Sequence, residues 1–339
     1  MSMRTDFPVV VSAVLGAVGL LFACDNTGSV GDDASAQPSD ASTPTPDGSS
    51  TVMNGAAGEA SSSGDTAMVT PQAYVRIAQW SPDAPAVDVC FNLVGAPWTG
   101  QVPHLARVVA ARDAGAPGDA GAAGISFPQV TSYLVIPPGS YEVRLVVAGS
   151  ADCSRPVIDL ATVTLAASSF TTIAALGEST PVGTDQPLSL VPFVDEVSAP
   201  PGQIALRFIN ASPGAPTLAQ ADLGTGSLAG AGGPFAPLFT GVGFGKTAGS
   251  DAGAVDANGY VASTPLATAT LSAHPTAVGA DATVALNDVT ITATRAATVA
   301  LVNGVSKIAS SAPKLLQCAD VDNSAGSSLL STCSIISTQ

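Results

Sequence analysis

The stretch from Ala73 to Val89 reads AYVRIAQWSPDAPAVDV, and it decides the fold class that we predict for this chain. Its first residues alternate apolar and polar side chains with a period of two, which is typical of a β-strand. The segment SPDAP follows, where Pro fixes the backbone and Asp can bond its own turn. The closing VDV begins a second strand. A strand, a tight turn and a second strand indicate a β protein.

Short strand-like runs continue beyond this stretch. They cover residues 133–136, 141–147, 157–165 and 170–176, and turn signals such as Pro-Pro-Gly separate them. Strands of this length and spacing predict an all-β sandwich. We expect two Ala- and Gly-rich pieces, Ala110–Gly124 and Leu223–Gly233, to be long surface insertions, because Gly and Pro every few residues oppose a helix.

A weak internal repeat sets the domain count. The segment AYVRIAQWSPDAP at 73–85 is matched by IALRFINASPGAP at 204–216, and the run FTTIAALG at 170–177 is matched by AATVALVN at 296–303. Two copies of one unit therefore account for most of the chain. We predict a first domain over 71–198 and a second over 203–339, with a linker at the Pro-rich Ser198–Gly202.

The opening stretch resembles the signature of the DUF4397 family, in which an Arg-bearing strand, a Ser-Pro-Asp-Ala-Pro turn and a Val-Asp-Val strand follow one another. Later blocks around Tyr133, Tyr141 and 170–177 are similar to that family too. The second copy is degenerate, since Gly214 replaces the turn Asp, and Asp222 is a candidate counterpart of Asp88. The resemblance implies two tandem immunoglobulin-like β-sandwich domains in a bacterial envelope or secreted protein, and no established activity.

Composition excludes several classes of protein. The chain has 339 residues with 11 Lys and Arg against 26 Asp and Glu, a formal net charge of −15. Binding to nucleic acid needs clustered Lys and Arg for the phosphates, so we expect no nucleic-acid partner. Only 11% of residues are charged, which excludes coiled coils and charged helical bundles.

The N-terminus is predicted to be an export signal. Residues 1–23 combine Arg4 with an apolar run, as secretory signals do. The run ends in Leu21-Phe22-Ala23-Cys24, which resembles the bacterial lipobox, so acyl chains on Cys24 are expected to anchor the protein to a membrane. We expect an exported protein, lipid-anchored to the bacterial cell envelope, with the choice of inner or outer membrane open.

A tether is predicted to follow the anchor. Residues 24–70 are rich in Ser, Asp, Pro and Gly, and the part from Asp25 to Thr70 carries seven acids and no Lys or Arg. Without apolar periodicity such a segment cannot bury enough surface to offset its conformational entropy. We interpret it as a disordered spacer between the lipid and the domains.

Four further cysteines indicate two disulfides. An even number of cysteines in an exported chain is typical of paired thiols, and four allow three connectivities. Proximity and domain membership favour Cys90–Cys153 and Cys318–Cys333. No two cysteines have the Cys-x₂-Cys spacing of a zinc site, so we expect no metal.

A few residues are candidates for ligand binding. Asp83 and Asp88 flank the Pro turn, where either a ligand site or turn capping and pairing of Asp88 with Arg76 would explain them. Arg76 is a charged residue in a half-buried strand, so it is either paired or ligand-binding. Trp98 follows Ala-Pro in a loop and is the aromatic residue most expected to be exposed, whereas Trp80 and Tyr141 are expected in the core.

Three functions follow from these features. The first is a non-enzymatic envelope lipoprotein whose sandwiches serve as structural or binding modules, with an envelope protein or polysaccharide as partner. The second is a carbohydrate- or polymer-binding surface module, which needs exposed aromatic residues. The third is an envelope hydrolase, the least favoured, because only His104 and His274 are available and no catalytic motif is present. We therefore expect no enzyme and no cofactor.

Overall fold

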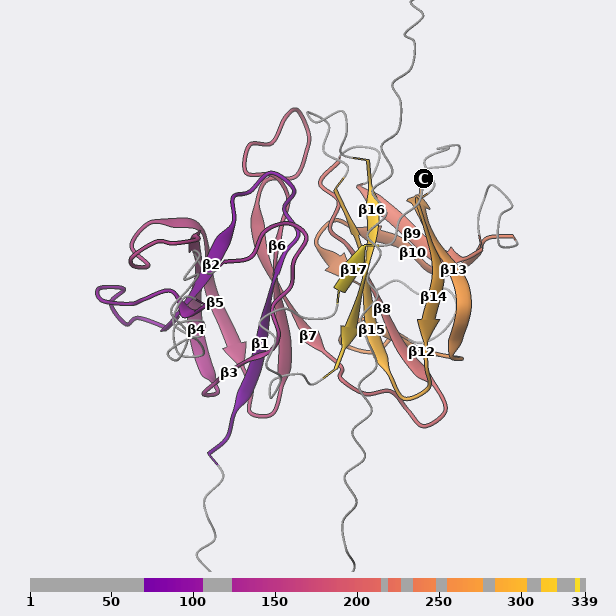
Figure 1. Ribbon diagram of the computed structural model, residues 1–339, viewed down its shortest axis with the longest axis horizontal. Coiled ribbons are helices and arrows are strands. Elements are labelled where there is room, and N and C mark those ends of the chain that lie inside the picture. The colour runs from indigo at the N-terminus through magenta and orange to yellow at the C-terminus, as the bar shows by residue number, and fades with distance from the viewer. Residues whose placement is uncertain are drawn as a thin grey trace, which may run out of the picture. The chain divides into compact units, whose positions relative to one another are not determined.

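The computed structural model describes residues 70–105, 124–214, 219–226, 234–247, 255–276, 284–303, 312–321 and 333–335. These residues form strands joined by turns and loops, and they belong to one compact unit (Figure 1). The prediction of an all-β protein with tandem sandwiches is therefore confirmed. The predicted signal, Cys24 and the tether up to residue 69 lie outside the described residues.

Two sheets make up the first half. Its strands are β1 (Ala73–Gln79), β2 (Val87–Leu93), β3 (Leu134–Ile136), β4 (Gly139–Val147), β5 (Pro156–Leu165), β6 (Phe170–Leu176) and β7 (Ser189–Asp195). One sheet has the order β3-β1-β6-β7, with β1 parallel to β6, and the other has the order β2-β4-β5. Apolar side chains of both sheets form a single core cluster, so the sheets face one another as a sandwich.

The second half is built alike. Its strands are β8 (Ile204–Asn210), β9 (Gln220–Thr225), β10 (Ala236–Gly243), β11 (Lys246–Thr247), β12 (Tyr260–Ser263), β13 (Leu266–Pro275), β14 (Val284–Ile291), β15 (Ala296–Val302), β16 (Lys314–Asp320) and β17 (Cys333–Ile335). The sheet β12-β8-β15-β16 repeats the order of β3-β1-β6-β7, including the parallel pair β8 and β15. The sheet β9-β13-β14 repeats β2-β4-β5, and β10 extends it. The repeat seen in the sequence is thus a repeat of topology (Figure 1).

Strand burial divides the sheets into two kinds. In β4 and β14 buried and accessible residues alternate, as expected where one face meets the core and the other meets solvent. In β8 and β15 every residue is buried, and β1 and β6 are nearly so. A strand that is buried on both faces needs a packing partner on each face. These central strands therefore contact a second layer in addition to the core of their own sandwich.

That second contact lies between the two halves. An apolar cluster joins first-half residues Ala78, Trp80, Val130, Ala174, Leu176 and Phe193 to second-half residues Ile209, Ala211, Ala300, Val302, Leu316 and Cys318. The sheet with β1, β6 and β7 therefore packs against the sheet with β8, β15 and β16. Trp80 is 1% exposed and Tyr141 is 8% exposed, as expected for core aromatic residues.

One predicted insertion is wrong in part. Leu223 was expected to begin a surface loop, yet Gln220–Thr225 is strand β9 and Leu223 is fully buried in the core of the second half. The Gly-rich sequence did not reveal this short strand. The strand requires glycine at Gly224, because a side chain there would collide with the backbone of Ala236. Residues 227–233 of this segment, and 110–123 of the other, lie outside the described residues.

Candidate functional site

The most distinctive polar group in the described residues is a set of buried charges between the two halves, which we call the interface network. Its ion pairs cross from one half to the other. Arg76 of β1 donates from Nη2 to Asp320 of β16, and Arg207 of β8 donates from Nη2 to Asp195 of β7. All four side chains are at most 1% exposed. The two pairs are therefore reciprocal, and solvent does not reach them.

Within the first half the network is completed by two hydroxyls. Thr172 Oγ1 accepts from Arg76 Nε at 2.7 Å and donates to Asp195 Oδ2 at 2.6 Å. The Tyr133 hydroxyl donates to the same Oδ2 at 2.8 Å, and the Arg76 guanidinium lies 4.9 Å from the centre of the Tyr133 ring. Arg76 Nε is also 3.5 Å from Asp195, so this carboxylate faces both arginines.

The second half supplies an equivalent set. Thr298 Oγ1 accepts from Arg207 Nε at 3.0 Å and donates to Asp320 Oδ2 at 2.6 Å. The Tyr260 hydroxyl donates to that Oδ2 at 2.8 Å, and the Arg207 guanidinium lies 4.6 Å from the centre of the Tyr260 ring. The same four residue types thus occur in each half with the same bonds.

Main-chain acceptors complete the reciprocity. Arg76 Nη1 donates to the carbonyl oxygen of Ala319 at 3.3 Å, and Arg207 Nη1 donates to that of Val194 at 2.8 Å. Ala319 and Val194 each precede the Asp of the other half. The two halves are therefore related within the interface as the two subunits of a symmetric dimer are, where residue i contacts j and j contacts i.

Charge pairing dominates the electrostatics of the network. Burial by itself would raise the pKa of the Asp195 carboxyl, but Arg76 and Arg207 outweigh burial and lower that pKa. Burial by itself would lower the pKa of Arg76, and Asp195 with Asp320 raises it instead. Burial raises the pKa of the Tyr133 hydroxyl, which therefore stays protonated and donates to Asp195.

A sealed network of this kind has a structural use. Charges that are paired and hydrogen-bonded on all sides fix which surfaces meet and in which register, although they add little net stability over apolar packing. Arg76, a predicted ligand-binding candidate, directs its guanidinium to protein groups in this interface. The pairing of Arg76 with Asp88 that the sequence suggested is wrong, because Asp195 and Asp320 are its partners.

The sequence contained a signal for this network that residue-by-residue inspection missed. Thr172 and Thr298 occupy the same position in the matched runs FTTIAALG and AATVALVN. Asp195 and Asp320 both end the strand that follows, opposite Phe170 and Ala296. A charged residue repeated at the end of matched strands would have indicated partners for the repeated arginines.

Asp83, another candidate, ties the Pro turn to a distant loop. Its carboxylate accepts from the Ser179 amide at 2.7 Å and the Ser179 hydroxyl at 2.8 Å, and from the Thr180 amide and hydroxyl at 3.2 Å each. The Ser81 hydroxyl also lies 3.4 Å from it. Asp83 therefore joins the turn after β1 to the loop after β6, beyond the local capping that the sequence predicted.

Trp98 lies half-buried against a disulfide. Its ring packs on Cys90, Val146 and Cys153, its Nε1 donates to Glu142 Oε2 at 3.1 Å, and the Arg144 guanidinium lies 4.1 Å from the ring centre. No second aromatic ring contacts it among the described residues. Trp98 therefore covers the Cys90–Cys153 disulfide, and the Arg144 guanidinium covers the outer face of the Trp98 ring.

Both predicted disulfides are present. Cys90 of β2 pairs with Cys153 in the β4–β5 loop, and Cys318 of β16 pairs with Cys333 of β17. The first crosslinks the smaller sheet of the first half, and the second fixes β17 to the edge of the sheet that contains β16. The favoured connectivity is confirmed.

The two histidines lie in different surroundings. His104 has an edge-to-face contact with Phe91. His274 Nδ1 is 3.9 Å from Asp222 Oδ2, and Asp222 Oδ1 accepts from the Thr276 hydroxyl at 2.6 Å and the Gly241 amide at 2.7 Å. Asp222, the candidate counterpart of Asp88, lies in β9, an inner strand between β10 and β13. His274 Nδ1 is also 3.0 Å from the carbonyl oxygen of Pro275.

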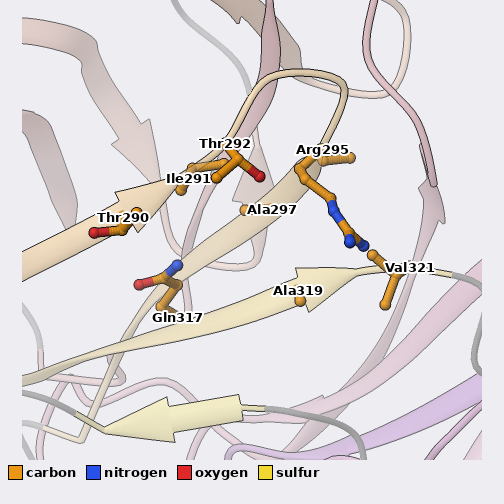
Figure 2. Close-up of a pocket in the computed structure, with 9 residues that line it drawn as sticks. Thr290, Ile291, Thr292, Arg295, Ala297, Gln317, Ala319 and Val321 are labelled. Carbon is orange, nitrogen blue, oxygen red and sulfur yellow. The ribbon is translucent and has the colours of Figure 1, made fainter. Parts of the chain in front are cut away.

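Two cavities bear on a ligand site in the described part of the chain. The smaller, about 160 Å³, lies beside His104 and Tyr141 in the first half. The larger, about 310 Å³, opens in the second half between the end of β14, the following turn and β16, and its lining includes Arg295 and Gln317 (Figure 2). The described residues contain no group of three His, Cys, Asp or Glu side chains suited to a metal ion.

Comparison with known proteins gives one family. The family described as "Domain of unknown function (DUF4397)" matches residues 73–220. The match covers the first sandwich and continues through β8 to the start of β9, beyond the linker that the sequence predicted. A comparison with curated proteins found no match. In the described residues no helix has the length and apolar character needed to cross a membrane.

Proposed function

We propose that this chain is an exported bacterial lipoprotein, anchored to the cell envelope by acyl chains on Cys24, whose β-sandwiches act as a non-enzymatic structural or binding module. The observation that carries the proposal is the use of the five cysteines. Four pair as two disulfides, which form in oxidising compartments outside the cytoplasm. Cys24 is the fifth, and it closes the lipobox-like segment.

The interface network supports the structural part of this proposal. The buried charged residues at the interface, Arg76, Arg207, Asp195 and Asp320, bind one another and are closed to solvent. A pair of domains fixed in this way has a defined spacing and orientation at the end of a tether. Such a rigid double unit suits a spacer or a presenting module better than a catalyst.

The second sandwich is proposed to be a degenerate copy of the DUF4397 unit. It repeats the strand order, the parallel pair and the Arg, Thr, Tyr and Asp of the interface network. The apolar residues of the interface have diverged, as Trp80 and its counterpart Ala211 show, while the four polar residue types are kept. The pair would then have arisen as a fused dimer of one ancestral unit, with the two arginines kept because each needs the other half.

A carbohydrate- or polymer-binding role is the second candidate. Two aromatic residues do not favour it, because Trp98 is half-buried under Arg144 and Tyr133 belongs to the interface network. The larger cavity of the second half does favour a small-molecule ligand, since its volume of about 310 Å³ falls in the range of known ligand sites.

Labelling with radioactive palmitate in a bacterial host tests the anchor. We expect the full chain to incorporate label into a form whose maturation globomycin blocks, and the Cys24→Ala variant to incorporate none. Because two acyl chains hold a protein stably and an unlipidated chain is released, the variant should leave the membrane fraction. Equal labelling of the two forms, or membrane retention of the variant, would refute the anchor.

A further inference from the structure

The larger cavity is formed where the two sheets of the second sandwich separate at one edge. Its apolar wall consists of Ile291 at the end of β14, Ala297 of β15, Ala319 of β16 and Val321. Ile291 and Ala297 also belong to the core cluster of this half. The cavity is therefore a pocket that reaches the core from the edge, with small side chains along its floor.

The polar side chains that line the cavity have no partner among the other described residues. The side chains of Thr290, Thr292, Arg295 and Gln317 make no hydrogen bond or ion pair with other described residues. In Figure 2 the Arg295 side chain and the Gln317 amide lie on opposite sides of Ala297 and Ala319. In a chain with 11 basic residues and a net charge of −15, this guanidinium beside the cavity has no partner among the described residues.

The first sandwich carries larger side chains at the equivalent positions. Strand pairing gives the counterparts directly, because Thr171 opposes Val194 in the first half as Ala297 opposes Ala319 in the second. Thr171 and Val194 are larger than the two alanines. The counterpart of Arg295, one residue before the strand, is Ser169. The two alanines and the arginine that line this cavity are therefore not repeated at the equivalent positions of the first half.

We propose that this pocket binds a small carboxylate that carries neighbouring hydroxyl groups. Guanidinium binds carboxylate through charge-assisted, two-pronged hydrogen bonds, which assigns the acid group to Arg295. The Gln317 amide and the Thr290 and Thr292 hydroxyls are suited to ligand hydroxyls, and the alanine floor admits a compact carbon skeleton. The described residues that line the cavity include no aromatic side chain, so they offer no stacking platform for a neutral sugar ring. Free hydroxy acids and uronic acid units share the required chemistry.

Titration calorimetry on the purified full chain tests the pocket with sodium glucuronate, sodium lactate and, as a neutral control, glucose. We expect at least one acid to bind with a dissociation constant of about 1 mM or tighter, and glucose not to bind. Glucuronate alone would assign a uronic acid unit, and lactate alone would assign a smaller hydroxy acid. This test does not depend on Cys24, so its outcome is independent of the lipid anchor.

Variants taken from the first half give matched controls. Arg295→Ser should weaken binding about tenfold to a hundredfold, the range expected for a hydrogen bond to a charged group. Ala319→Val should fill the cavity and abolish binding, and the fold should tolerate it because Val194 occupies the equivalent position. Arg155→Ser removes an exposed cation from the first half and Val194→Ala reverses the size change there, and neither should alter binding.

Three results would overturn the proposal. They are the absence of binding of both acids to the unmodified chain, equal binding of glucose, and binding that survives Arg295→Ser and Ala319→Val. Circular dichroism and thermal melting of each variant show whether it is folded. If Ala319→Val is misfolded, Ala297→Thr gives a second way to fill the same space, since Thr171 is its counterpart.

Discussion

The two halves of this chain share the buried charges where they meet, although Trp80 of the first half corresponds to Ala211 of the second, and they differ more where they face outward. At the interface each contributes an Arg, a Thr, a Tyr and an Asp with the same bonds. At the outer edges one half carries Trp98 over a disulfide, and the other carries an open pocket and an additional strand, β17. The reciprocal ion pairs restrict substitution of the charged residues, because a substitution on one side removes the partner of a buried charge on the other.

Removal of Asp195 should have the largest effect. Asp195→Ala leaves Arg207 buried without its carboxylate and deprives Arg76 of its second one, and breaking a buried pair in this way costs about 3–5 kcal/mol. Asp320→Ala should cost less, because Arg76 keeps Asp195 at 3.5 Å. Urea unfolding of the two variants measures both free energies. Similar losses below about 1 kcal/mol, as for exposed ion pairs, would contradict a sealed network.

A double variant sharpens the same point. Replacing Arg76 and Asp320 together with Met and Leu removes both charges of one pair, so neither remains buried alone. We expect the double variant to be more stable than Asp320→Ala, since apolar replacement of a whole buried pair is often neutral. A loss equal to the sum of the single losses would show that the two side chains act independently.

The two disulfides should differ less in the stability that each contributes. The loop-entropy relation gives about 4 kcal/mol for Cys90–Cys153, which joins residues 63 apart, and about 3 kcal/mol for Cys318–Cys333, which joins residues 15 apart. Paired Cys→Ala variants and thermal melting measure the difference.

Mild reduction tests access to the same bonds. Cys90 and Cys153 are at most 1% exposed under Trp98, whereas Cys333 is only half-buried. Reduction should therefore open Cys318–Cys333 first and free β17. Mass mapping of alkylated thiols at increasing reductant reports the order, and prior opening of Cys90–Cys153 would refute it.

The sequence predicted the strands better than the interface because the two depend on different information. Alternation in segments such as SYEVRLVV follows from one buried and one wet face, so local pattern suffices. The run IALRFIN is buried throughout, and its Arg207 suggests an exposed or paired side without naming the partner. That partner, Asp195, lies in the other half. The pocket was equally hidden, because it depends on Ala297 and Ala319 being smaller than their counterparts across a sheet.

A backbone position gives the next test. Gly177 follows β6 at φ 89°, and its counterpart after β15 is Asn303 at φ 68°. A Cβ at Gly177 would lie 2.2 Å from the Pro187 carbonyl oxygen, so Gly177→Asn should cost about 2 kcal/mol or more although the second half accepts Asn. Asn303→Gly should cost about 1 kcal/mol, from its hydrogen bond to Ala312. Thermal melting compares the two, and equal tolerance would show that the loop after β6 can move.

Acid should lower the stability that the interface network contributes. This effect should be smallest near neutral pH. Arg76 and Arg207 hold the folded pKa of Asp195 below the value of about 3.9 expected in the unfolded chain. The unfolded state then binds more protons than the folded state between these two pKa values, so this contribution to stability is complete above the unfolded pKa and is lost as pH falls through the folded one. The melting temperature should therefore be flat from about pH 7 to pH 5 for this group and fall below about pH 4. Asp195→Asn, which cannot titrate, should melt lower at neutral pH but decline less steeply in acid, and an unchanged acid slope in that variant would assign the acid sensitivity to carboxylates outside the interface network.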